Sequence, residues 1–112
     1  ERMIHHEIFH MIDNSFPELF KKNQWSELNN KDFSYASCST CTDLLGLDLE
    51  ITKGFLTEYS MSTAEEDMAE IYSLLKTNFK EIDLLIKKDN ILTKKKNFLI
   101  NGLKEIDEKF IF

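Results

Sequence analysis

Glycine, proline and cysteine are scarce in this chain of 112 residues, which contains 3, 1 and 2 of them. So few turn-forming residues exclude a collagen-like chain or a flexible linker and argue against a turn-dense β-sandwich. Two cysteines allow at most one disulfide bond, which excludes a disulfide framework. No apolar run approaches the roughly 20 residues of a membrane-spanning helix, so we expect no membrane span.

Basic residues are outnumbered: 14 Lys and Arg stand against 20 Asp and Glu, for a net charge of −6. A nucleic-acid-binding surface needs excess positive charge to replace counterions, so we expect no nucleic-acid partner. The length suits one small domain over residues 1–112, without a linker or repeat to divide it. Because the chain starts with Glu1 and its first motif follows within six residues, we expect a C-terminal portion of a longer protein.

The spacing of apolar residues predicts a mainly α fold. We expect long helices at 1–13, 62–76, 79–88 and 92–109, short helical turns at 17–22 and 25–28, an irregular segment at 29–52 and an extended piece at 53–58. Ser62 and Glu65 have the spacing of a capping box at the start of the second long helix. In the last helix, an apolar stripe is expected to face the core and Lys94–Lys96 to form the solvated face.

The segment from His6 to His10 reads His-Glu-Ile-Phe-His and fits the motif H-E-x-x-H. Residues four apart on a helix lie one above the other, so both imidazoles can reach one point. Neutral imidazole is a good zinc ligand, and a carboxylate next to a zinc-bound water can act as a general base. The motif therefore predicts a zinc site with His6 and His10 as ligands and Glu7 as the base. The alternative is a helix with two ordinary surface histidines.

A catalytic zinc needs a third protein ligand, and the second long helix offers acidic candidates. Glu65 is expected in the capping box, which leaves Glu66 to bind zinc and Glu70, four residues on, to support a histidine from behind. Acidic residues in a first turn also occur simply because they complement the helix dipole. Tyr59 precedes Glu66 by seven residues and could donate a hydrogen bond to an oxyanion, or be a partly buried loop residue.

Three stretches together, His-Glu-Ile-Phe-His-Met-Ile-Asp (6–13), Gly-Phe-Leu-Thr-Glu-Tyr-Ser (54–60) and Ala-Glu-Glu-Asp-Met-Ala-Glu (64–70), resemble zinc metallopeptidases of the gluzincin type. The likeness is to the catalytic domain of anthrax lethal factor and to the bacterial zinc-binding metallopeptidase families around it. The resemblance implies the C-terminal half of a zincin-like domain, with an active-site helix, a helical bundle and an irregular middle segment.

The resemblance also implies a function and its residues: hydrolysis of peptide bonds in a peptide or protein substrate. His6, His10 and Glu66 would bind Zn²⁺, Glu7 would be the general base, and Tyr59 the oxyanion donor. At the level of the family, a secreted or cell-surface location is expected.

Two alternatives place these residues in a non-catalytic protein. Cys38 and Cys41 form a C-x-x-C pair that could join His6 and His10 in a closed structural zinc site. Such a site would leave Glu7 and the acids of the second helix without a role. The other alternative is a degenerate interaction module of the peptidase fold, because the β-sheet that precedes the active-site helix in these peptidases has no counterpart in this chain.

Overall fold

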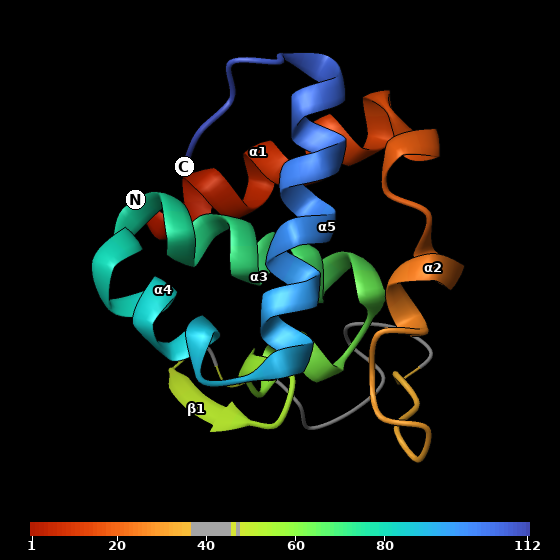
Figure 1. Ribbon diagram of the computed structural model, residues 1–112, viewed down its shortest axis with the longest axis vertical. Helices are drawn as coiled ribbons and strands as arrows, with labels where there is room; N and C mark the ends of the chain where they lie inside the picture. Colours follow the sequence, from red (N-terminus) through yellow and green to blue (C-terminus); the bar gives the residue numbers. More distant parts are fainter. Residues whose placement is uncertain (37–45, 47) are drawn as a thin grey trace.

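The computed structural model describes residues 1–36, 46 and 48–112, and within them the fold is mainly helical, as predicted (Figure 1). Cys38 and Cys41 lie outside the described residues. The described elements in chain order are α1 (Arg2–Ser15), η1 (Pro17–Leu19), α2 (Lys22–Ser26), β1 (Leu49–Thr52), β2 (Phe55–Thr57), η2 (Tyr59–Met61), α3 (Ala64–Thr77), α4 (Phe79–Lys87) and α5 (Asn90–Ile106).

The start of α3 differs from the predicted capping box. Thr63 is the N-cap, and its hydroxyl accepts a hydrogen bond from the Glu66 N–H at 3.1 Å. Thr63 has the extended backbone that an N-cap requires, whereas Ser62 still has helical angles at the end of η2. The Ser62 hydroxyl instead donates to the Tyr59 carbonyl at 2.7 Å. The capping residue therefore lies one position later than expected, and Glu65 is exposed.

The extended piece predicted at 53–58 contains β2, which forms an antiparallel hairpin with β1, and Thr52 pairs with Phe55 across a Lys53-Gly54 turn. Strand β1 lies in the segment 29–52 that was predicted to be irregular, so the prediction was wrong for its last four residues. Gly54 has a φ of 89°, which favours glycine, and an added Cβ would lie 2.8 Å from the Ile91 side chain. The turn is tied to α5 because the Gly54 N–H donates to Asp89 Oδ2 at 2.7 Å. The hairpin is thereby held against the start of α5.

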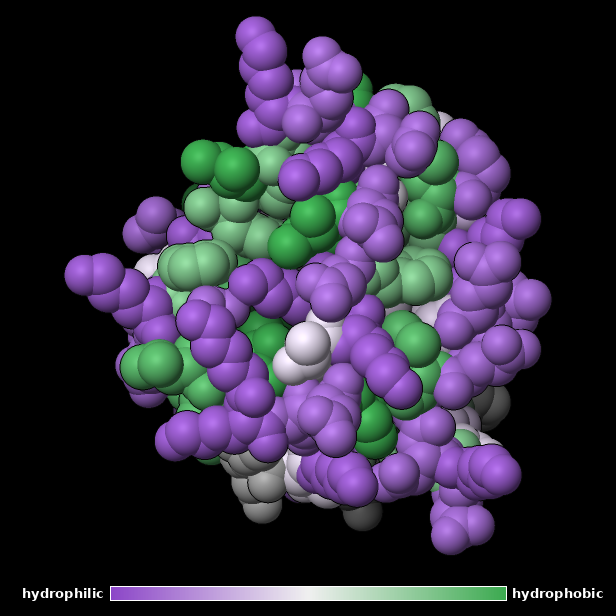
Figure 2. Space-filling model, in the orientation of Figure 1, coloured by the Kyte–Doolittle hydropathy of each residue, from purple (hydrophilic) through white to green (hydrophobic). Residues whose placement is uncertain are grey.

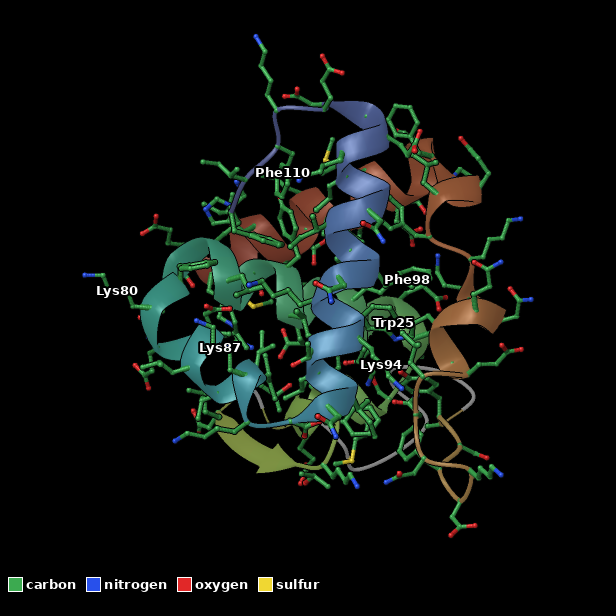
Figure 3. The ribbon with its side chains drawn as sticks, viewed as in Figure 1. Trp25, Lys80, Lys87, Lys94, Phe98 and Phe110 are labelled. Carbon is green, nitrogen blue, oxygen red and sulfur yellow. The ribbon has the colours of Figure 1, made fainter. Side chains whose placement is uncertain are left out.

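The hydrophobic core surrounds α3, which is buried over most of its length. On one side Phe9 of α1 packs against Phe20 and Tyr72, with ring centroids 5.2 and 5.3 Å away. On another side Trp25 of α2 meets Phe98 of α5 at 5.4 Å, and Figure 3 shows these two side chains next to each other. The central position of α3 lets one helix carry residues for both the core and a site shared with α1.

Lys95 contradicts the expectation that Lys94–Lys96 forms a solvated face. Lys94 is exposed and Lys96 half-buried, but Lys95 is fully buried. Its ammonium donates to Asp67 Oδ2 and to the Gly54 carbonyl, both at 2.7 Å, and lies 3.9 Å from the centre of the Phe55 ring. The prediction was wrong because three successive helical residues point about 100° apart, so they cannot share one face.

The outward face of α1 is apolar. The buried residues of α1 are His6, Phe9 and Asp13. On the outward face of the helix, Ile4 and Met11 are 64% and 68% exposed. The apolar spacing thus predicts the helix correctly, and of the apolar residues that carry it Ile4 and Met11 face solvent whereas Ile12 packs against the core. On the face seen in Figure 2, polar side chains predominate and apolar ones form small groups between them.

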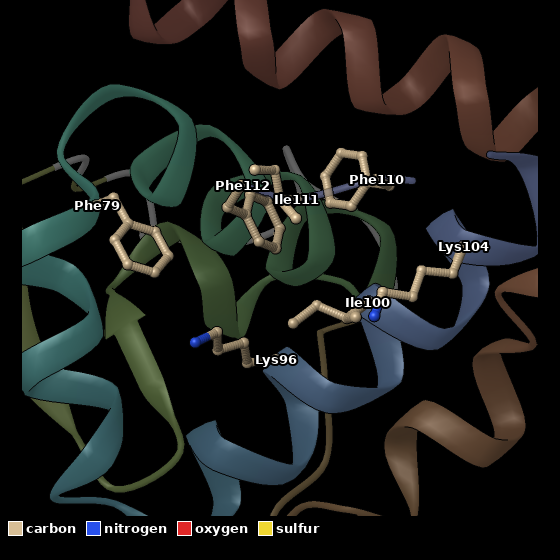
Figure 4. A pocket seen from close by; sticks show the side chains of 7 residues that line it. All are labelled: Phe79, Lys96, Ile100, Lys104, Phe110, Ile111 and Phe112. Atoms are coloured by element: carbon tan, nitrogen blue, oxygen red, sulfur yellow. The ribbon is translucent and has the colours of Figure 1, made fainter. Parts of the chain in front are cut away.

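A pocket of about 220 Å³ lies beside α5, between Phe79, Lys96, Ile100, Lys104 and the C-terminal residues 110–112 (Figure 4). It contains none of the residues that the sequence predicts for catalysis or metal binding.

Gly102 of α5 allows close packing against η1, and replacement by Ala is expected to destabilise the fold. An added Cβ would lie 2.5 Å from the Phe20 ring and 3.0 Å from the Leu19 carbonyl oxygen. We expect Gly102→Ala to lower the free energy of unfolding by about 1–3 kcal/mol in urea denaturation, although Ala favours helix formation. The exposed neighbour substitution Asn101→Ala should stay within about 0.5 kcal/mol. A Gly102→Ala protein at least as stable as the parent would contradict this account of the packing.

Candidate metal centre

Two helices bring together three of the predicted ligands. His6 and His10 lie one turn apart on α1, and Glu66 lies in the first turn of α3. The Nε2 atoms of the two histidines are 3.1 Å apart, and Glu66 Oε1 is 2.9 Å from His6 Nε2 and 2.6 Å from His10 Nε2. The three atoms therefore form a small triangle. His6 is buried, and the His10 side chain, at 25% exposure, gives the triangle access to solvent.

The donor set suits zinc. Ligand atoms about 2.0–2.1 Å from a tetrahedral zinc ion lie about 3.3–3.4 Å from one another. The observed separations of 2.6 to 3.1 Å require the three groups to spread by less than about 1 Å to hold such an ion. Two imidazoles and one carboxylate also match the ligands of catalytic zinc sites, which keep a fourth position open.

The charges at this triangle favour a bound cation. Burial disfavours the charged form of His6, but hydrogen bonds with Glu66 and Glu70 and the charges of both outweigh burial and raise the pKa of His6 to about 9. Burial also opposes ionisation of Glu66, but hydrogen bonds from His10, His6 and Tyr59 hold its pKa well below its usual range. The site thus stabilises positive charge among these atoms, and zinc and protons compete for them.

Glu7 lies beside the triangle and is exposed. Ligand-type atoms of His6, Glu7 and His10 all lie within 4.8 Å of one another, so these residues alone could also be considered a metal-binding group. Glu66 is the better third ligand because its oxygen already contacts both imidazole nitrogens. Glu7 is left close to the centre and open to water, as a general base must be.

Tyr59 and Glu70 support the triangle from two sides. The Tyr59 hydroxyl donates to Glu66 Oε2, so it would reach a substrate oxygen only after leaving that carboxylate. Glu70 is fully buried, and its Oε2 lies 2.9 Å from His6 Nδ1. A carboxylate at Nδ1 keeps the proton on that nitrogen and directs the Nε2 lone pair towards the triangle. The neighbouring His5 is half-buried and is not part of the triangle.

A family model described as "Putative zinc-binding metallo-peptidase" matches residues 1–112. The chain belongs to this metallopeptidase family. No curated protein and no solved structure matches it, so the specific likeness to anthrax lethal factor stays a prediction. Among the described residues of this family member, no helix is long and apolar enough to cross a membrane.

Sequence reasoning missed the residues that hold Glu70 and α3 in this metallopeptidase family member. Arg2 Nη2 donates to Glu70 Oε1 at 2.5 Å, and the Thr57 hydroxyl donates to the same oxygen at 2.8 Å. Arg2 is four residues before His6, so the same helical spacing that relates the two histidines could have indicated its position. Thr57 gave no such signal because its contact with Glu70 joins two separate elements.

Proposed function

We propose that this chain is a zinc-dependent peptidase domain that hydrolyses peptide bonds with Glu7 as general base. The observation that carries the proposal is the convergence of His6 Nε2, His10 Nε2 and Glu66 Oε1 from two helices, with the Glu7 carboxylate beside them. Membership of a metallopeptidase family supports the same chemistry at a general level. Peptides or proteins are the substrates that such chemistry acts on.

In this mechanism His6, His10 and Glu66 would hold zinc. When bound, zinc supplies a Lewis acid that polarises the scissile carbonyl and makes a nearby water more acidic. Glu7 takes a proton from the attacking water and later delivers it to the leaving amine. Tyr59, released from Glu66, would donate a hydrogen bond to the carbonyl oxygen as negative charge develops there. Glu70 keeps His6 in the tautomer that presents Nε2.

Zinc binding tests the first half of this proposal. We expect the protein to bind one zinc ion per chain and Glu66→Ala to weaken binding by more than about 100-fold, because two imidazoles alone leave the site short of a ligand. Affinity is measured by competition with a chromophoric chelator. Glu65→Ala is the matched control, since it removes an exposed carboxylate from the same helical turn and should leave affinity unchanged.

The same measurement separates catalytic and structural sites. If Cys38→Ser and Cys41→Ser release the zinc while Glu66→Ala does not, the closed structural site replaces the present proposal. If all of these variants bind zinc as the parent does, Glu66 is not a ligand.

A further inference from the structure

Thr57 stands at the centre of a buried set of hydrogen bonds behind the metal triangle. Thr57, Ser60 and Glu70 are all fully buried. The Thr57 hydroxyl lies 2.8 Å from Glu70 Oε1 and 2.8 Å from the Ser60 hydroxyl, and it accepts from the Ser60 N–H at 3.2 Å. Removal of the Thr57 oxygen would take this partner from the Ser60 hydroxyl and N–H and would leave Glu70 Oε1 with Arg2, and the loss of a hydrogen bond to a buried polar group is costly.

The direction of each hydrogen bond follows from the number of hydrogens available. An ionised carboxylate only accepts, so the single hydroxyl hydrogen of Thr57 is directed at Glu70. The Ser60 hydroxyl must then donate to Thr57, as its backbone N–H also does. Glu70 Oε1 thus receives hydrogens from Thr57 and Arg2, which leaves Oε2 facing His6 Nδ1.

The same hydroxyl also reaches the turn that carries Tyr59. Ser60 follows Tyr59 directly in η2, and its two bonds to Thr57 connect that turn to the end of β2. Tyr59 in turn donates to Glu66 Oε2. Thr57 is therefore linked to both sides of the metal triangle, to His6 through Glu70 and to Glu66 through the turn of Tyr59.

We propose that Thr57 is a positioning residue of the metal centre, whose hydroxyl orients Glu70 behind His6 and holds the Tyr59 turn against Glu66. The inference rests on the proposed function, because it concerns the residues assigned there to zinc. Thr57 does not touch the triangle itself. Its removal should loosen the orientation of His6 and so weaken zinc binding without removing any ligand.

Paired substitutions separate the hydroxyl from the packing of this side chain. Thr57→Val keeps the shape and loses the hydroxyl, and it should raise the zinc dissociation constant about 10-fold. Thr57→Ser keeps the hydroxyl and loses a methyl group, and its zinc dissociation constant should stay within about 3-fold of the parent value. Thr93→Val is the matched control, since it removes a hydroxyl that donates to the Ile86 carbonyl at 2.9 Å, away from the centre.

Zinc affinity is measured by chelator competition, and the melting temperature of the metal-free protein is recorded in parallel. Nitrogen-15 NMR of His6 supplies a second signature: in the zinc-loaded parent Nδ1 should carry a proton, and Thr57→Val should shift that signal. If Thr57→Val does not fold, Ser60→Ala tests the same link from its other end and should also weaken zinc binding.

Three results would overturn the inference. The first is an unchanged zinc affinity in Thr57→Val or in Ser60→Ala. The second is a loss of zinc affinity in Thr57→Ser as large as that in Thr57→Val, and the third is an equal loss of zinc affinity in Thr93→Val. Each leaves the proposed function intact as long as the parent protein binds zinc. A parent protein that binds no zinc removes the metal centre itself, and the role of Thr57 with it.

Discussion

Replacement of Glu7 by Gln is expected to abolish peptide hydrolysis by the zinc-loaded protein while zinc stays bound. Glutamine keeps the size and polarity of the side chain but cannot accept a proton from the attacking water. General base catalysis contributes about 10²–10⁴-fold to the rate, so kcat should fall by at least about 10²-fold. Cleavage of a quenched fluorescent peptide library by the parent and the variant measures the loss, and elemental analysis measures the zinc.

The location of Glu7 makes this substitution a sharp test. The side chain is exposed, so Glu7→Gln should leave the melting temperature unchanged. Glu65→Gln is the control, because it makes the same chemical change at an exposed acid on α3 and should cleave like the parent. Activity that survives Glu7→Gln would remove Glu7 as the base, and loss of zinc from that variant would show it to be a ligand.

Replacement of Lys95 by Met is expected to destabilise the fold by about 3–5 kcal/mol. The ammonium of Lys95 is the only cation that contacts Asp67 among the described residues, and both side chains are fully buried. Burial raises the pKa of Asp67 and lowers that of Lys95, and the charge of each partner opposes the shift of the other. Removal of one charge leaves the other buried without compensation. Urea denaturation measures the difference in the free energy of unfolding.

Two control proteins test whether the destabilisation comes from loss of the ion pair between Lys95 and Asp67. Lys94→Met makes the same change at an exposed position and should stay within about 0.5 kcal/mol of the parent. Lys95→Met combined with Asp67→Asn should recover part of the loss, because no unpaired charge remains in the core. Lys95→Met with the stability of Lys94→Met would show that the ion pair contributes nothing measurable.

The ion pair bears on the metal centre because Asp67 directly follows Glu66. Asp67 Oδ2 also accepts hydrogen bonds from Trp25 Nε1 at 3.1 Å and from the Tyr35 hydroxyl at 2.5 Å. Together with the ion pair to Lys95, these bonds tie the first turn of α3 to α2, to Tyr35 and to α5. Glu66 then points towards α1, about 100° away from Asp67.

Much of this arrangement follows from short-range patterns. The four-residue spacing of His6 and His10 predicts their common direction on any helix, and Glu7 must then lie beside them. The helices at 79–88 and 92–109 were predicted within about three residues of α4 and α5, because apolar periodicity is a local property. In α3, Met68 and Ile71 are both fully buried, and their spacing of three residues is that of neighbours on one helical face.

Contacts between distant elements account for what the sequence left undecided. Ser62 and Thr63 are both good N-caps, and only the path of η2 selects Thr63. Lys94, Lys95 and Lys96 are chemically identical, and only the position of Asp67 on another helix makes Lys95 the buried one. Thr57 gains its contact with Glu70 only when the hairpin packs against α3.

By itself the sequence determined a mainly helical chain, a pair of imidazoles one turn apart and a group of acids in the first turn of a second helix. The sequence also predicted Glu66 at the imidazoles and Glu70 behind one of them, and the tertiary structure brings both there. Only the tertiary structure decided that Asp67, in the same helical turn as Glu66, enters the core. The reason is geometric: helical periodicity sets the angles between side chains of one helix, whereas the rotation and placement of that helix against its neighbours depend on packing across the whole fold.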